Sequence, residues 1–542
     1  MTNHRISLHD FPGTPSQQLS AAGDYCRANP GTTLLIPPGK YVLSDPRAKA
    51  IQEAVLSGAY GNNPQPVMFH PAFSYTHGLD LTDCHDITVE AYGVSLCIDG
   101  FLEPLTLHHA SDIRICGLQI DHLRKPFSLG IIIAADDAAG TIDILPSPAT
   151  PFDERASSPR IFVVESDTGH ISDTTFSSDD FVERKPHGLL RYRCRFSRNP
   201  VGFAAYFTHT FHFRPAILIS HSERVTLEDV TIHSMAGMGI VGFKSEDIVI
   251  RRLQVVPSPG FHMSTNTDAT HFACCRGTIL VEHSLFAGHG DDAINVHNYY
   301  YTPISCDDSL TTVTLTVRTP DGTHAQQPDI PKSGYTLQLV DKHSLVPLDT
   351  YRVVKSTDTT DPCHVLLDHP LPADAAQNTL FANLTEQPTL IFRHNIVHDH
   401  LARAVLCKTS HATISDNAFL YSTGTAIHVA AEAQWGEGIA PSDVTISGNT
   451  FDCCGLTRYG RYNMASAVSV NISAANTDAV GILHNICITD NYVILPPTCR
   501  RAFYLANATG VRLHGNIVEN TGGCAPLCIH CCTDTVYDLP CE

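Results

Sequence analysis

Three aspartates lie at two points of the sequence that are 23 residues apart, with Asp268 at the first point and Asp291 and Asp292 at the second. A structural repeat of about that length would bring the two points together, so that three carboxyl groups would share one small patch. Repulsion among them would raise the pKa of at least one, leaving an acid beside two bases. Inverting hydrolysis of a glycosidic bond uses such a set, because one group protonates the leaving oxygen while another activates water. A single aspartate would more simply cap a turn or bind an ion, whereas three in register by one repeat favour catalysis.

The residues after the aspartate pair alternate as in a β-strand. Asn295 and His297 would point outward, because the aliphatic residues beside them would point into the protein. Strict alternation would point Asp292 inward, but a buried and unpaired carboxylate is costly. We therefore expect both carboxylates of the pair to reach the surface at a turn, which Gly288 and Gly290 permit.

A short segment recurs along the chain from about Asp83 onward. Four copies read His85-Asp86-Ile87-Thr88-Val89, Ser111-Asp112-Ile113-Arg114-Ile115, Ser222-Glu223-Arg224-Val225-Thr226-Leu227 and Ser245-Glu246-Asp247-Ile248-Val249-Ile250. The first two copies are 26 residues apart and the last two are 23 apart. Repeats of this length that are built on short strands indicate a solenoid.

A second repeat sharpens this prediction in the C-terminal half. An asparagine followed two residues later by Phe or Val recurs at Asn395, Asn417, Asn449, Asn491 and Asn516. Asparagine tolerates left-handed backbone and can stack its amide on the next copy, which predicts an asparagine ladder at a β-helix turn. The longer steps after Asn417 and Asn449 predict two surface loops, one with Glu432, Trp435 and Glu437 and one with the cluster 458–462. Such insertions usually gather on the binding face of a solenoid.

Segment boundaries follow from where the repeat holds and where it breaks. Two stretches contain only short alternating runs with frequent Pro, Asp and Gly, and we interpret both as inserted antiparallel β-barrel-like modules. They would serve as buttresses or bind carbohydrate, and their lack of tryptophan favours buttresses. Helix-compatible Pro15–Ala28 and Pro46–Leu56 flank a β-run at Thr32–Tyr41 and predict an N-terminal helical cap. The predicted all-β order is cap and first rungs 1–82, β-helix 83–130, module 131–208, β-helix with catalytic rungs 209–300, module 301–383, β-helix 384–530 and C-terminal tail 531–542.

Further polar residues could hold a sugar next to the aspartates. Arg403 and Lys408 fall on one predicted rung, but their odd separation would point them to opposite faces of a straight strand, so that at most one would bind substrate unless the strand bends. Trp435, the only tryptophan, could stack on a sugar or pack in the core. Metal binding through His289 and His297 is the weaker alternative, and we expect no cofactor. The candidate substrate-binding residues are Asn266, His271, Asn295, His297, Arg403, Lys408, Glu432 and Trp435.

The composition excludes several classes of protein. The 542 residues carry a net charge of −20, which argues against a nucleic-acid partner and favours a neutral substrate. The sequence contains no run of 18 apolar residues that would predict a membrane-spanning helix. The first residues lack the apolar core of a signal peptide, and the nineteen scattered cysteines suit reduced thiols. We therefore expect a cytoplasmic protein, and a trimmed secreted chain would show the same pattern.

The residues around the aspartates resemble the signature of glycoside hydrolase family 110, the α-galactosidases that cut terminal α-1,3-linked galactose. The likeness comprises Thr267–Phe272, the Cys-Arg-Gly turn after it and Asp291–His297, and it extends from Asp83 to about Asn520. It implies a right-handed parallel β-helix with β-barrel insertions, metal-independent chemistry and inversion at the anomeric carbon. The implied substrate is a galactose-terminated oligosaccharide or glycan.

Carried over by position, the resemblance makes Asp291 the general acid, with Asp268 and Asp292 holding the water. A similar set, one aspartate followed by a pair, occurs in the polygalacturonase family of β-helices, where the first of the pair is the acid. His289-Gly290 before the pair and Asn298 after it depart from the family's flanks. These departures leave open whether linear α-1,3-galactose or the branched blood-group B determinant is preferred.

Rival interpretations come from other classes. A polygalacturonase-like hydrolase would need cationic residues to hold a uronate, and the expected Arg-Ile-Lys motif is missing. A polysaccharide lyase would need a calcium site or an arginine base beside an acidic sugar, which the acidic chain disfavours. A non-catalytic carbohydrate-binding scaffold would bind the same glycan without turnover. Outer β-helix surfaces could also pair two copies into a homodimer.

Overall fold

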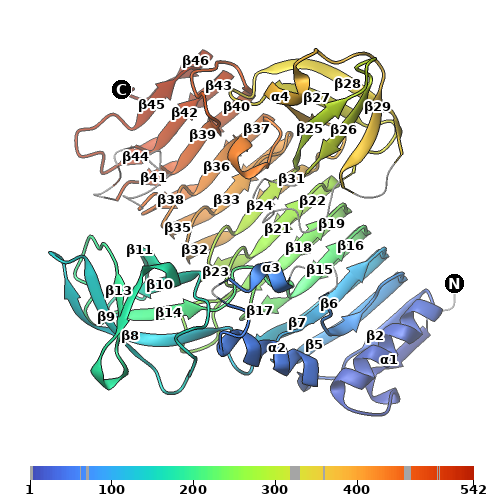
Figure 1. The fold of residues 1–542 in the computed structure, drawn as a ribbon, viewed down its shortest axis with the longest axis vertical. Helices are drawn as coiled ribbons and strands as arrows, with labels where there is room; N and C mark the ends of the chain where they lie inside the picture. Colours follow the sequence, from blue (N-terminus) through green and yellow to red (C-terminus); the bar gives the residue numbers. More distant parts are fainter. Residues whose placement is uncertain are drawn as a thin grey trace.

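The chain forms a right-handed parallel β-helix that carries two inserted modules (Figure 1). The computed structural model describes residues 4–61, 63–68, 73–317, 330–357, 361–456, 466–496, 499 and 501–541. In Figure 1 the coil climbs from the blue N-terminal rungs to the red C-terminal ones, with one module at the lower left and the other at the upper right.

The predicted repeats stack in register as rungs. Successive rungs place one buried aliphatic residue beside another in the order Ile87, Ile113, Val225, Ile248 and Ile279. Parallel strands with such aliphatic stacks bury a continuous core along the coil, and the predicted solenoid is confirmed.

The rungs build two parallel sheets, which we call the paired sheet and the single sheet. Most rungs give the paired sheet two consecutive strands and the single sheet one. Among the described residues the paired sheet has 22 strands: β1 (His4–Ser7), β2 (Thr32–Leu35), β3 (Gly39–Ser44), β5 (His85–Asp99), β7 (Ser111–His122), β16 (Glu223–Glu228), β17 (Thr231–Ile232), β19 (Glu246–Arg251), β20 (Gln254–Val255), β22 (Arg276–Glu282), β23 (Leu285–Ala287), β31 (Thr389–Arg393), β32 (Ile396–His400), β34 (Ala412–Ser415), β35 (Ala418–Ser422), β37 (Ser442–Ser447), β38 (Thr450–Asp452), β40 (Leu483–Thr489), β41 (Tyr492–Ile494), β43 (Ala508–His514), β44 (Ile517–Glu519) and β46 (Thr533–Tyr537).

The single sheet positions the aspartates at the start of its central strands. Over the same described ranges it has 11 strands: β4 (His77–Asp80), β6 (Glu103–His108), β15 (Ile217–Ser220), β18 (Ile240–Phe243), β21 (Thr270–Ala273), β24 (Ile294–His297), β33 (Val405–Cys407), β36 (Ile427–Glu432), β39 (Val468–Ser473), β42 (Phe503–Ala506) and β45 (Leu527–His530).

The asparagine ladder is present, with one correction. Each buried asparagine accepts a hydrogen bond through Oδ1 from the backbone of the preceding copy, as from Asn417 N–H to Asn449 at 3.0 Å and from Asn449 N–H to Asn491 at 3.0 Å. The left-handed residue is the one before each asparagine, not the asparagine itself, because the amide must point inward to reach its neighbour. These preceding residues are His394, Asp416, Gly448, Asp490 and Gly515.

The N-terminal cap follows the predicted helices. α1 (Pro15–Ala28) and α2 (Pro46–Leu56) both start with proline, and the side chains of Thr14 and Asp45 accept hydrogen bonds from their first turns. The predicted β-run is two strands, β2 and β3, that both pair with β5 and so join the cap to the coil. Two short helices, η1 (Leu8–Asp10) and α3 (Gln65–Met68), complete this region.

The first module, from Phe127 to Thr208, is a seven-stranded antiparallel sheet in the order β11-β10-β14-β8-β9-β13-β12. Its first strand starts four residues before the predicted boundary, and its ends are adjacent because Phe127 pairs with Thr208. The elements are β8 (Phe127–Asp136), β9 (Thr141–Pro146), β10 (Arg160–Val164), β11 (Ile171–Phe176), η2 (Ser178–Asp180), β12 (Phe181–Arg184), η3 (Pro186–Gly188), β13 (Leu190–Arg193) and β14 (Ala204–Thr208).

The second module is a closed barrel in the order β25-β26-β29-β28-β27-β30. Its core includes Val313 and Leu315, which point inward from a strand that was predicted by alternation. Its elements are β25 (Tyr300–Cys306), β26 (Thr312–Thr316), β27 (Thr336–Asp341), β28 (Pro347–Ser356), β29 (Cys363–Leu367), α4 (Ala375–Asn378) and β30 (Thr379–Asn383).

The predicted C-terminal tail, 531–542, instead contributes one more strand to the coil. β46 pairs in parallel with β43 and extends the paired sheet. The predicted cluster 458–462 lies outside the described residues. Among the residues that the structure describes, no two of the nineteen cysteines are joined by a disulfide. Within the described ranges, none of the helices has the length and apolar character that crossing a membrane requires.

Candidate active site

The three aspartates meet at the start of two neighbouring strands of the single sheet. Thr270 lies opposite Ile294 in the register of β21 and β24, which places Asp268 one rung from Asp292. One oxygen from each carboxyl of Asp268, Asp291 and Asp292 lies within 4.8 Å of the other two. The backbone N–H of Asp292 also donates to Oδ1 of Asp268 at 3.1 Å. The structure therefore brings together the three carboxyl groups that were predicted to share a patch.

Gly290 lets the chain approach this point closely. A Cβ at position 290 would lie 2.2 Å from the backbone oxygen of Asn266, so a larger residue would push the two rungs apart. The Asn266 amide donates to the backbone oxygens of Pro126 and Thr210 at 3.2 and 3.1 Å. Asn266, predicted to bind substrate, therefore uses its N–H groups to hold the loop, while its buried Oδ1 has no hydrogen-bond partner among the described residues.

Asp292 does not reach the surface, which corrects the expectation for the aspartate pair. Its side chain is 1% exposed. Arg403 compensates the charge through Nε at 2.8 Å and Nη2 at 2.9 Å, and its backbone N–H adds a bond of 3.0 Å. A bidentate arginine in a buried position offsets the desolvation that made burial look unfavourable.

Arg403 and Lys408 point toward the same side, because the straight strand that would place them on opposite faces does not extend to either residue. β33 contains only Val405–Cys407, and both residues lie beyond its ends, where strand alternation does not apply. Lys408 Nζ lies 2.5 Å from Glu432 and also contacts Glu437, and Arg403 approaches Glu432 at 3.9 Å. The buried Lys408 is thus enclosed by two carboxylates.

Two histidines connect this network back to the aspartates. Nδ1 of His271 lies 2.6 Å from Asp268, and its Nε2 lies 2.8 Å from Nε2 of His297. Nδ1 of His297 lies 3.0 Å from the backbone oxygen of Asn298, which assigns the His297 proton to Nδ1. Because burial lowers the pKa of His297 to about 4, its Nε2 is a neutral acceptor for a proton on His271. His297 also lies 3.9 Å from Glu437, which closes the network.

The pKa values of the aspartates support an acid beside bases. Burial raises the pKa of Asp268 to about 7, and the charge of Asp292 adds to this shift while His271 opposes it. Burial also raises the pKa of Asp292, although Arg403 opposes the shift. The sequence prediction was right in direction, but burial is a larger cause than repulsion. The cluster therefore retains a proton up to about neutral pH.

Arg160 is the site residue that the sequence did not indicate. It starts β10 of the first module, and its Nη1 lies 3.2 Å from Oδ2 of Asp291 and contacts the backbone oxygen of Gly290. Its guanidinium also lies 4.7 Å from the ring centre of Phe211. The contact spans 131 residues, and no local pattern marks Arg160 as a partner of Asp291.

The remaining predicted residues lie around this network. Asn295, expected to point to solvent, is 5% exposed, and its Oδ1 has no hydrogen-bond partner in the part of the chain that the structure describes. Trp435 ends the short helix η4 (Ala433–Trp435) between Glu432 and Glu437 and is half-buried. The loop that was predicted to gather on the binding face therefore adjoins the candidate site.

The donor set does not suit a metal ion. The three carboxyls have the spacing of metal ligands, but both oxygens of Asp292 accept from Arg403, and Asp291 contacts Arg160. A cation would have to displace both arginines. The alternative pair His289 and His297 does not converge, because His289 stacks on His400 with ring centres 4.5 Å apart while His297 faces His271.

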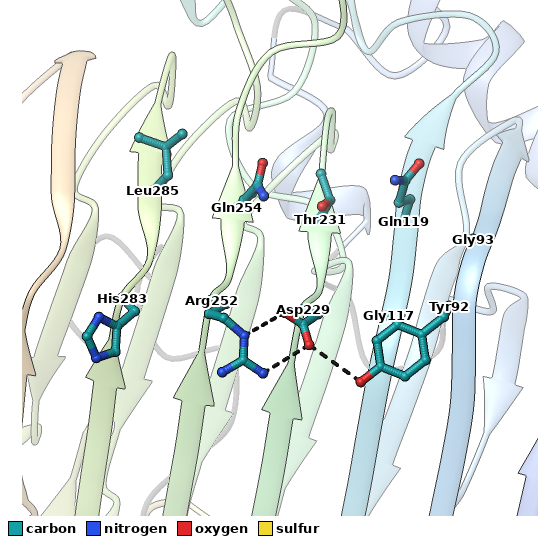
Figure 2. A pocket seen from close by; sticks show the side chains of 10 residues that line it. All are labelled: Tyr92, Gly93, Gly117, Gln119, Asp229, Thr231, Arg252, Gln254, His283 and Leu285. Carbon is teal, nitrogen blue, oxygen red and sulfur yellow. Dashed lines mark hydrogen bonds and ion pairs between the residues drawn. The ribbon is translucent and has the colours of Figure 1, made fainter.

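A groove of about 690 Å³ lies on the paired sheet, away from the strands that begin at the aspartates. Figure 2 shows Arg252 and Tyr92 both directed at Asp229, whose two oxygens lie 2.6 and 3.0 Å from the guanidinium. Because this carboxylate is held by a bidentate arginine, the groove offers no acid and base pair for hydrolysis among its lining residues. These are Tyr92, Gly93, Gly117, Gln119, Asp229, Thr231, Arg252, Gln254, His283 and Leu285.

Comparisons with known proteins agree with the geometry. No family model matches the chain. Alpha-1,3-galactosidase B of Akkermansia muciniphila is 26% identical over 508 residues, which cover 89% of this chain and 62% of that protein. Alpha-1,3-galactosidase A of Bacteroides fragilis is 26% identical over 520 residues, which cover 90% of this chain and 83% of that protein.

Solved structures resemble the chain more remotely. The A-module of mannuronan C-5 epimerase AlgE4 from Azotobacter vinelandii is 10% identical, with a TM-score of 0.43 over 98% of this chain and 97% of that chain. The chain spans less than two thirds of the Akkermansia protein but most of the Bacteroides one. Over most of its own length the chain is therefore similar to proteins named α-1,3-galactosidases, which confirms the resemblance predicted from the residues around Asp268 and Asp291.

Proposed function

We propose that the protein is an exo-acting glycoside hydrolase that removes terminal α-1,3-linked galactose from oligosaccharides or glycans with inversion at the anomeric carbon. The observation that carries this proposal is the set of three carboxyl groups one rung apart, two of them fixed by buried partners and one facing outward. The similarity to α-1,3-galactosidases supports the choice of sugar and linkage.

Asp291 is the proposed general acid. Its side chain is 19% exposed, against 7% for Asp268 and 1% for Asp292, so it is the carboxyl best placed to meet a glycosidic oxygen. The cluster keeps a proton because burial raises the pKa of Asp268 to about 7. In a set of interacting carboxyls the proton belongs to the set, and the most accessible member can deliver it.

Asp268 and Asp292 are the proposed water-holding pair. Each oxygen of Asp268 accepts one hydrogen bond, from Asp292 N–H and from His271, and Arg403 holds both oxygens of Asp292. Held in this way, Asp292 has both oxygens engaged by Arg403, while each oxygen of Asp268 keeps acceptor capacity for a water. This supports inversion by attack of water.

The spacing of the carboxyls makes the stereochemical test informative. One oxygen of each carboxyl lies within 4.8 Å of the other two, which bounds only the nearest atoms. The separation that distinguishes inverting enzymes, about 6.5–9.5 Å, from retaining ones, about 5–5.5 Å, is measured between whole carboxyl groups, so the anomer released is the direct test of inversion.

A neutral sugar fits this site better than a uronate. Arg403 and Lys408 are neutralised by Asp292, Glu432 and Glu437, so carboxylates outnumber cations around the aspartates. An acidic sugar would be repelled, which argues against a polygalacturonase-like activity. The half-buried Trp435 is the proposed stacking partner for the apolar face of galactose.

The test follows product formation by proton NMR with α-1,3-galactobiose and with its fucosylated blood-group B counterpart. We expect β-galactose to appear first and to mutarotate later. Early α-galactose would overturn inversion and point to a covalent intermediate. Binding without release from either substrate would replace the hydrolase by a carbohydrate-binding scaffold, and comparing the two substrates decides between linear and branched glycans.

A further inference from the structure

Three histidines gather at one end of the single sheet, away from the aspartates. His108 ends β6, His109 follows it, and His221 follows β15 one rung later. Ser220 pairs with His108 in the strand register, so His221 lies beside His109. His109 and His221 both have a φ of +52°, which gives the two turns the same left-handed shape and places their side chains in the same direction.

The three imidazole rings converge on one point. One ring nitrogen from each lies within 4.8 Å of the other two. The ring centres are 4.1 Å apart for His108 and His109, 5.1 Å for His109 and His221, and 5.5 Å for His108 and His221. His109 is exposed and the other two are half-buried, so an ion could enter from solvent.

Neighbouring groups orient one of the three rings, that of His221, as metal sites usually require. Nδ1 of His221 lies 2.9 Å from the hydroxyl of the buried Ser220, which leaves Nε2 of that ring for a ligand. Phe243 packs edge-on against His221 with ring centres 5.5 Å apart. A second hydrogen bond that fixes the ring and an apolar wall are common features around metal-ligating histidines.

We propose that His108, His109 and His221 bind one divalent transition-metal ion of the zinc type, with three imidazole ligands and an exchangeable water. Neutral imidazoles suit zinc, copper and nickel, whereas calcium and magnesium prefer oxygen ligands. Zinc–nitrogen bonds of about 2.0–2.1 Å draw the three nitrogens closer together, and the half-exposed rings can rotate to meet them.

The surrounding charges are mixed. Asp83, on the turn of the preceding rung, donates its backbone N–H to the backbone oxygen of His108 at 2.9 Å and adds a negative charge near that ring. Lys244, on the next rung, lies 3.9 Å from Glu386, which offsets its charge. The positive charge of Lys332, in the second module, also acts electrostatically on the ring of His221. A site that relies on neutral ligands rather than on carboxylates fits this environment.

The proposed ion would join the two rungs that flank the first module. His109 and His221 are neighbours in space but lie 112 residues apart in the sequence, because the whole module is inserted between them. Closing such a long insertion costs chain entropy, and a ligand that binds only the closed form stabilises it by mass action. The ion therefore acts as a clip between the two rungs that the insertion separates in the sequence, rather than in catalysis.

The experiment uses the full chain without an affinity tag, stripped with a chelator and titrated with Zn²⁺ by calorimetry. We expect one bound ion per chain. His109→Asn and His221→Asn remove one ligand each, and asparagine tolerates the left-handed backbone at both positions. Each variant should weaken binding by roughly 100-fold, which is the upper end of the effect seen when a metal site loses a supporting group.

His411→Asn is the matched control, because His411 also has a positive φ, of +59°, and lies on a turn outside the cluster. Its zinc binding should equal that of the parent. Circular dichroism verifies folding, and His108→Gln provides a second ligand variant if either turn variant fails to fold. Absence of zinc binding in the parent, or equal binding in parent and ligand variants, overturns the proposal.

Discussion

The three aspartates and the three histidines are assembled in the same way but are surrounded differently. Each set takes its members from turns of neighbouring rungs, with carboxyl oxygens or ring nitrogens within 4.8 Å of one another. Arg403, His271 and Arg160 each hold one of the aspartates, whereas the ring of His221 has one nearby hydroxyl, that of Ser220. The stacked rungs of a solenoid thus readily bring equivalent side chains together. The groups around such a cluster determine whether it is rigid enough for catalysis.

The largest contrast between the clusters should be in turnover. Asp291→Asn removes the proposed acid, and we expect kcat to fall about 10²–10⁴-fold in a galactose-release assay. His109→Asn should keep kcat within about twofold of the parent, because its ring lies outside the network of the aspartates. An Asp291→Asn enzyme that retains more than about a tenth of the parent kcat would remove Asp291 from the acid role.

The second contrast is in stability, between buried and exposed partners of the same type. Arg403→Met leaves Asp292 buried without its bidentate partner and should lower the free energy of unfolding by about 3–5 kcal/mol. Arg252→Met breaks an equally bidentate pair with Asp229, but the side chains of that pair are 49% and 34% exposed, so the loss should stay below about 1 kcal/mol. Urea denaturation of both variants measures the difference. Equal losses in the free energy of unfolding would mean that burial does not determine how much Arg403 stabilises the protein.

The third prediction concerns pH and only the carboxyl cluster. Because burial raises the pKa of Asp268 to about 7, the folded state keeps a proton that the unfolded chain releases near pH 4. The contribution of Asp268 to the stability of the parent should therefore decline as pH rises from about 4 to 7 and level off above that. Asp268→Asn removes this dependence, so its stability relative to the parent should improve by on the order of 2 kcal/mol between pH 5 and pH 8.

Denaturation curves at the two pH values test this linkage, with His109→Asn as the variant whose difference from the parent should not follow the same course. A stability difference between Asp268→Asn and the parent that is constant with pH would contradict the raised pKa of Asp268.

The smallest expected effect is that of metal removal, which should change the melting temperature through the three histidines but not the kcat that depends on the three aspartates. Chelation should leave kcat within about twofold, because the aspartates work with protein partners alone in the proposed reaction. The melting temperature should fall by roughly 2–4 °C when bound zinc is removed, and this shift should vanish in His221→Asn. Activity that disappears on chelation and returns with zinc would place a metal in the reaction and contradict the assignment of the aspartates.

The coil was predictable because each rung repeats its own local pattern. The register is predicted by the equivalent positions Ile87, Ile113 and Val225 of the repeated segments. The asparagines from Asn395 to Asn516 mark the same turn in successive rungs. Their spacing also placed Asp268 beside the aspartate pair. These predictions depend only on residues within one or two rungs of each other.

The partners of the aspartates could not be predicted in the same way. Arg403 reaches Asp292 across 111 residues, and Arg160 reaches Asp291 across 131, so neither contact leaves a periodic signal. Alternation failed for Arg403 and Lys408 because β33 is only three residues long. The burial of Asp292 was not predicted either. The desolvation cost of a buried carboxylate is offset only by Arg403, and the sequence does not show that the two residues meet.

The adjacent ends of the first module carry an evolutionary consequence. Since Phe127 and Thr208 are paired neighbours, a domain of this kind can be gained, lost or exchanged without altering the geometry of the rungs on either side. Yet this module delivers Arg160 to Asp291. Exchange of the first module would therefore change the charge beside the reacting carboxyls and leave all three aspartates in place. Lineages that share the coil could diverge in glycan preference through a domain that contains none of the acidic residues of the site.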